Sequence, residues 1–146
     1  MNTSTLRVLF SIFLIAHGLI HMSLATVPTP KPGEIHTPFW PGWWRDAVDT
    51  SWPASRLGLN PTLVRTLGWG LWLVVTAAFA LAGLGLLGVP GLNSLWQPAA
   101  VFASVASLIL LALYWHPWLV MGVAIDLALV LGIYAGWFQR FLPAAS

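Results

Sequence analysis

Two histidines lie four residues apart in the run AHGLIHM, residues 16–22 of an otherwise apolar segment. In a helix, residues i and i+4 project from the same face, so His17 and His21 would point in one direction. Two imidazoles placed in this way can bind one metal ion, as they do in the HExxH helix of zinc proteases. The residues between these histidines are Gly, Leu and Ile, so the glutamate of that enzyme class is missing.

The elements that must position this pair are set by the composition of the chain. Hydrophobic residues make up 58% of the 146 residues, charged residues only 7%, and the mean hydropathy is +0.82. Soluble domains carry about 25% charged residues, so this composition indicates a multi-pass integral membrane protein with the lipid bilayer as its main partner. A net charge of +2 is too small for a nucleic-acid-binding surface. The lack of cysteine excludes disulfides, thiolate metal sites and dithiol redox chemistry.

Four stretches are long enough to cross a hydrocarbon core, which takes about 20 residues of helix. They cover residues 8–27, 67–87, 95–115 and 118–137, and together they predict an all-α bundle of four transmembrane helices in a single domain, 1–146. The last two connections are short, so the helices that they join should be antiparallel. A cleaved signal peptide is the alternative for the first stretch, although two histidines make a poor signal-peptide core.

The one long connection, residues 28–66, is rich in Pro and Trp and is expected to form a cap at the membrane surface. Within it, Trp40, Trp44 and Val48 would share one face of a short interfacial helix. Asn60 and Pro61 predict the start of the following helix, as N-cap and first helical residue. Most tryptophans fall on the side of this loop: Trp40, Trp43, Trp44, Trp52, Trp69, Trp72, Trp115 and Trp118. Trp96 and Trp137 mark the other side, where both termini are expected to face the cytoplasm. A plain count of basic residues favours the opposite orientation, with the long loop in the cytoplasm.

Each predicted span carries a polar side chain at a similar depth below the tryptophan-rich face. At 1.5 Å of rise per residue, His21 lies about 9 Å deep and His17 about 15 Å. By the same rise Asp126 and Ser107 lie about 12 Å deep, and Thr76 about 14 Å. An ionisable group at this depth costs about 2.5–3.5 kcal/mol or more, so these side chains should face the bundle interior and find partners.

Three interpretations of this polar layer stay open. The first is a structural clasp, in which the groups only hydrogen-bond across helices. The second is a metal site of His17, His21 and Asp126 with water as a further ligand, or a single haem or quinone contact made by a histidine. The third is a proton or small-solute path along the His and Asp side chains.

Small and polar residues also predict helix contacts. The run AAFALAGLGLLG, residues 77–88, would allow a close approach of a neighbouring helix, and Gly132 with Gly136 forms a GxxxG pattern. Ser104, Ser107 and Tyr114 fall on one stripe of the third span, which is more typical of a helix–helix contact than of a ligand site.

The segment RVLFSIFLIAHGLIHM resembles the start of small bacterial four-helix membrane proteins that lie loosely near the DoxX-like group. The resemblance is specific at His17, Gly18 and His21 and generic over the later spans, and Asp126 is carried over less firmly. It implies a four-helix bundle, in some members linked to quinone-coupled or sulfur-redox complexes. The absence of cysteine argues against a thiol-redox role here.

Together these features predict a small polytopic protein of the bacterial cytoplasmic membrane, accessory or ligand-binding in function. The alternative is a subunit of a membrane oxidoreductase that holds a metal ion or a quinone at His17 and His21. Other membrane subunits or a second copy of the chain are its expected protein partners. The sequence does not decide whether the protein is an enzyme, and it assigns no catalytic residue.

Overall fold

The computed structural model describes residues 2–26, 56–115 and 119–142, which are helical with no strand among them. Four long helices, α1 (Thr3–Thr26), α3 (Pro61–Leu86), α4 (Trp96–Leu113) and α5 (Val120–Tyr134), form the body of the fold. Two short elements, the 3-10 helix η2 (Asn93–Leu95) and the helix α6 (Trp137–Phe141), flank α4 and α5. The expected all-α class is confirmed.

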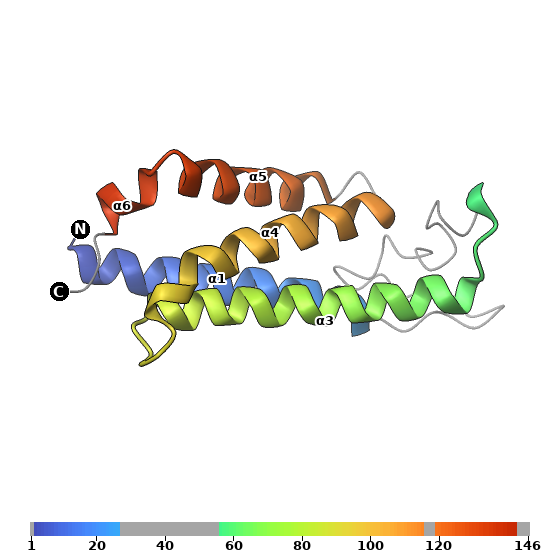
Figure 1. Cartoon of the computed structure of the whole chain (residues 1–146), viewed down its shortest axis with the longest axis horizontal. Coiled ribbons are helices and arrows are strands. Elements are labelled where there is room, and N and C mark those ends of the chain that lie inside the picture. The colour runs from blue at the N-terminus through green and yellow to red at the C-terminus, as the bar shows by residue number, and fades with distance from the viewer. Residues whose placement is uncertain (1, 27–55, 116–118, 143–146) are drawn as a thin grey trace, which may run out of the picture.

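The long helices alternate in direction, and the start of α1 lies at the same end of the bundle as α6 (Figure 1). Along the bundle α1 packs on α3, α3 on α4, and α4 on α5. Helices that are neighbours in the chain are therefore also neighbours in space, which is the usual arrangement of consecutive elements. The expected interfacial helix of residues 40–48, and Trp118, lie outside the described residues.

Asparagine caps decide where the first two long helices begin. The Asn60 side chain accepts a hydrogen bond from the backbone N–H of Leu63 at 3.3 Å, and α3 begins at Pro61 as the sequence predicts. Asn2 accepts from the backbone N–H groups of Ser4 and Thr5 at 2.6 and 3.2 Å. The helix α1 therefore begins at Thr3, five residues before the predicted span, because its start is set by the Asn2 cap and not by where the apolar residues begin.

Three segments are long and apolar enough to cross a membrane: Thr3–Met22, Thr66–Leu86 and Asn93–Leu113. The fourth predicted span, residues 118–137, differs from a single continuous helix. The helix α5 ends at Tyr134, and Gly136 takes a left-handed backbone conformation with φ 69° before α6 begins. With 15 residues, α5 is shorter than the other three.

The expected GxxxG contact of Gly132 and Gly136 is wrong, because Gly136 is not part of the helix that holds Gly132. Gly136 lies at the end of α5, so it cannot share a helical face with Gly132. Gly132 instead makes room for α6: a Cβ at this position would lie 2.7 Å from a ring carbon of Phe138. The glycines thus allow the chain to fold back on itself and do not pair two long helices.

The outer surface of the bundle is apolar, as the interior is. Large apolar residues are exposed on every long helix, among them Ile12, Leu73, Ile109 and Leu131. Among the residues that the structure describes, six polar or ionisable ones are buried: Ser11, His17, His21, Ser104, Ser107 and Asp126. A fold that exposes leucine and buries aspartate is matched to an apolar surrounding.

Candidate functional site

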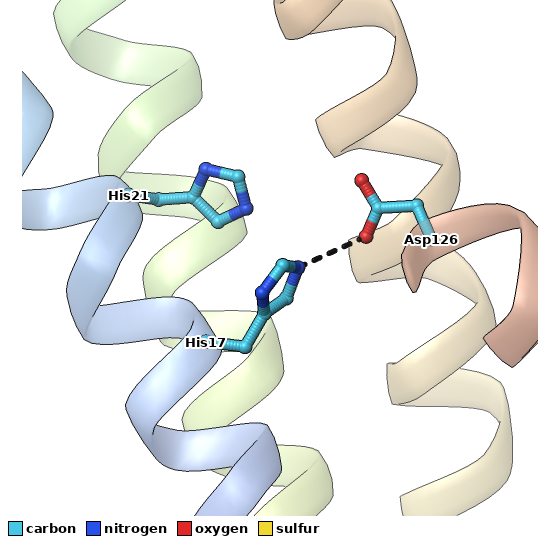
Figure 2. Close-up of side chains that lie close together, drawn as sticks. All are labelled: His17, His21 and Asp126. Carbon is cyan, nitrogen blue, oxygen red and sulfur yellow. Dashed lines mark hydrogen bonds and ion pairs between the residues drawn. The ribbon is translucent and has the colours of Figure 1, made fainter. Parts of the chain in front are cut away.

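The two histidines of α1 point into the bundle, toward the single aspartate of α5 (Figure 2). His17 and His21 are 5% and 3% exposed, and Asp126 is fully buried. Their spacing of four residues places both rings on one face of α1, and the centroids of the two rings lie 4.9 Å apart. Asp126 is the one acidic residue in the described part of the chain, so no other carboxylate there could serve these imidazoles.

His17 contacts Asp126 directly. Its Nε2 lies 3.2 Å from Oδ1 of the aspartate, within hydrogen-bonding distance, and the pair connects α1 to α5. An ionised carboxylate only accepts hydrogen bonds, so the N–H donor of this pair is His17 Nε2 when Asp126 carries its charge. The contact joins the first and last long helices, which lie at opposite ends of the packing order.

His21 contacts Ser107 of α4. The serine Oγ lies 3.1 Å from Nε2 of the imidazole, and both side chains are buried. Whether the hydroxyl donates or accepts depends on which ring nitrogen of His21 holds the proton. The predicted serine stripe of α4 is thus an interhelical contact at Ser107.

Thr76 of α3 completes the layer through the backbone of α1. Its hydroxyl lies 2.9 Å from the carbonyl oxygen of Gly18 and 2.8 Å from that of Trp72, and its one proton donates to these acceptors. Gly18 makes this approach possible, because a Cβ there would lie 2.9 Å from Cβ of Phe79 and 3.0 Å from the carbonyl oxygen of Thr76. The glycine between the histidines therefore sets the distance between α1 and α3.

All five residues that the sequence places in the layer are brought together around one face of α1. Each of the other three long helices contributes one of them: Thr76 from α3, Ser107 from α4 and Asp126 from α5. The layer is thus centred on α1, which contacts each neighbour through a different polar group.

Aromatic side chains surround the imidazoles, in contacts that are not predicted from the sequence. Phe79 packs edge-on against His17 with ring centroids 4.8 Å apart, and Trp72 tilts against His21 at 5.4 Å. Trp72 is only 9% exposed, so its ring lies inside the bundle. The signal was present, since Trp72, Thr76 and Phe79 follow the i, i+4, i+7 spacing of one helical face.

Two atoms of the layer are buried without a hydrogen-bond partner: Nδ1 of His21 and Oδ2 of Asp126. A buried polar atom left in this state costs about 1–3 kcal/mol, so it calls for an explanation such as an ion or a water molecule. The ligand atoms of His17, His21 and Asp126 all lie within 4.8 Å of one another. Nitrogen and carboxylate oxygen donors in this number suit zinc and divalent iron or manganese.

No family model, curated protein or solved structure gives a significant match to this chain, so its fold and its site are interpreted from its own residues.

Proposed function

We propose that the chain is a four-helix membrane protein whose buried layer binds one divalent transition-metal ion through His17, His21 and Asp126. Three apolar helices of membrane-spanning length and an apolar outer surface support its insertion in a bilayer. The fourth crossing would be made by α5 and α6 together, since residues 120–141 approach the length that a hydrocarbon core requires.

The observation that carries this proposal is the convergence of three buried ligand side chains from two helices. Ligands on one tetrahedral zinc ion lie about 2.0–2.2 Å from it, and hence about 3.4 Å from one another. The present separations of up to 4.8 Å would have to shrink by about 1.4 Å at most, which side-chain rotation can supply.

Three protein ligands leave at least one coordination position for water or a small ligand. That number is typical of catalytic metal sites, whereas structural zinc sites use four protein ligands. The surrounding Phe79, Trp72 and Phe13 rings would exclude bulk water from the ion. The activity that fits is binding or turnover of a small ligand inside the membrane, as expected for an accessory protein or an oxidoreductase subunit.

The same proposal includes the resemblance to DoxX-like proteins and a location in the bacterial cytoplasmic membrane.

A structural clasp is the second candidate, and one observation favours it. The three hydrogen-bonded contacts of the layer already connect α1 to α3, α4 and α5, one contact for each helix. Interhelical bonds in membranes contribute about 0.6 kcal/mol on average, so such a layer would specify packing more than it would add stability.

Metal analysis on detergent-purified protein separates the two candidates. Wild type would be compared with His17→Ala, His21→Ala and Asp126→Asn, and Ser104→Ala would serve as the control because Ser104 is buried on α4 but belongs to no contact of the layer. After removal of metal with a chelator, Zn²⁺ is titrated back, and Co²⁺ is added as a spectroscopic probe of coordination.

Uptake of about one ion per chain, lost in the three ligand variants and retained in Ser104→Ala, would support the metal site. A folded wild type that takes up neither ion would overturn it and leave the clasp. The same preparation tests the remaining interpretations: a quinone would be recovered by solvent extraction, and a proton path would show as pH-driven flux in vesicles.

A further inference from the structure

A cavity of about 300 Å³ is lined by residues from the end of the bundle where α1 begins and α6 lies. Arg7 of α1, Gln97 of α4 and Gln139 of α6 line it, together with Asn93 and Ser94 of η2. Ten residues of α1, about 15 Å of helix, separate Arg7 from His17, so this cavity is distinct from the His–Asp layer.

Arg7 is the one cationic residue in the lining of this cavity. It is partly buried, and its Nε is buried without a hydrogen-bond partner. A guanidinium group has five N–H donors and no acceptor, so it needs an anion or several acceptors when water is removed. Among the described residues the only carboxylate is that of Asp126, which already contacts His17.

The amide and hydroxyl neighbours of Arg7 in the cavity are polar and uncharged, and each can donate as well as accept hydrogen bonds. The side-chain amides of Gln97, Gln139 and Asn93 and the hydroxyl of Ser94 can each donate a hydrogen bond into the cavity. A guanidinium with several neutral donors around it matches the several acceptor oxygens of a phosphate group.

We propose that this cavity binds a phosphate group, independently of any metal ion at the His–Asp layer. The apolar segments that could cross a membrane end or begin beside it, at Leu86 and at Asn93, so in the membrane arrangement proposed above it lies at the depth of lipid headgroups. The phosphate could therefore belong to a phospholipid headgroup or be free in solution, and the two sources share the same recognition chemistry.

The test measures binding to delipidated protein in detergent. Phosphatidylglycerol is titrated and followed by native mass spectrometry, with diacylglycerol of the same acyl chains as the phosphate-free control. Inorganic phosphate is titrated separately at constant ionic strength, with chloride as the control anion. Arg7→Gln is compared with Arg140→Gln, which removes an exposed arginine of α6 at the same end of the bundle that does not line the cavity.

Wild type and Arg140→Gln should bind one phosphate-bearing molecule per chain, and Arg7→Gln should bind it at least about tenfold more weakly. Binding of the lipid but not of inorganic phosphate identifies a headgroup site, and equally tight binding of inorganic phosphate identifies a free-anion site. Gln97→Leu retains the charge and should weaken binding less than Arg7→Gln. If Arg7→Gln does not fold, Arg7→Lys replaces it, with reduced affinity expected because lysine lacks the planar fork of donors.

An equal loss of phosphate affinity in Arg7→Gln and Arg140→Gln would overturn the proposal, since it would mean that the phosphate is attracted by the net charge of the protein alone. So would binding of diacylglycerol as tight as that of phosphatidylglycerol, or the lack of binding of either phosphate compound to folded wild type.

Discussion

The hydroxyl of Ser107 on α4 lies 3.1 Å from Nε2 of His21 on α1, while Ser104, one turn earlier on α4, is equally buried and has no partner. The two serines therefore lie on the same helix and are equally buried, and they differ only in that Ser107 makes a hydrogen bond to a side chain. Their comparison separates the effect of an interhelical hydrogen bond from that of burying a hydroxyl group.

Ser107→Ala should lower the free energy of unfolding by about 1–2 kcal/mol, because it leaves Nε2 of His21 buried without its partner. Ser104→Ala should leave stability unchanged or raise it slightly, since it removes a buried hydroxyl that bonds to nothing. Reversible unfolding in mixed detergent micelles, followed by circular dichroism, measures both. Equal effects of the two substitutions would show that the Ser107–His21 contact is not energetically significant.

The contact between His17 and Asp126 should show strong coupling in a double-mutant cycle. His17→Phe or Asp126→Leu alone should destabilise by about 3 kcal/mol, because each leaves one polar partner buried and unpaired. The free energy of unfolding of the double variant should fall by clearly less than the sum of the two single effects, since both polar groups are then gone. Additive losses in the same unfolding assay would mean that the two side chains do not depend on each other.

The level of the polar layer could be predicted from the sequence, but its pairing could not. The helical rise fixes the positions of His17, His21 and Asp126 along their helices, whatever the neighbouring helices do. Which helix each imidazole faces depends on packing order and on rotation about the helix axis. These helices are apolar almost all round, so they carry no polar stripe that would reveal the rotation.

Two other features were missed because tertiary contacts override local signals. Glycine is common inside membrane helices, so Gly136 gives no sign in the sequence that α5 ends before it and that Phe138 packs back on Gly132. Trp72 has the chemistry of a membrane-interface residue, yet its ring packs against His21 inside the bundle. By contrast, the start of α3 depends on Asn60 and Pro61 alone, and this local signal is confirmed.

Gly18→Ala should destabilise the fold by about 1–3 kcal/mol and weaken any metal binding by the histidines on either side. The added methyl group would meet Cβ of Phe79 and the backbone of Thr76, and neither can move without shifting α3. Gly70→Ala is the matched control: Gly70 lies on α3, the helix that packs against Gly18, but a Cβ there meets nothing within 4 Å. Thermal unfolding of both variants checks this, and a Gly18→Ala protein as stable as Gly70→Ala would contradict the close contact.

Tyr114→Phe should destabilise the end of the bundle nearest the long loop, whereas Tyr134→Phe should not. The Tyr114 hydroxyl donates a hydrogen bond to the carbonyl oxygen of Val64 and so connects the end of α4 to the first turn of α3. Loss of this hydrogen bond should cost about 1 kcal/mol and increase amide hydrogen exchange over the first turns of α3.

Tyr134, the only other tyrosine, is 78% exposed, so removal of its hydroxyl should change stability by less than about 0.5 kcal/mol. Hydrogen-exchange mass spectrometry on the two variants measures the difference directly. If exchange near Val64 were the same in both, the Tyr114 hydroxyl would have no role in holding α3 to α4.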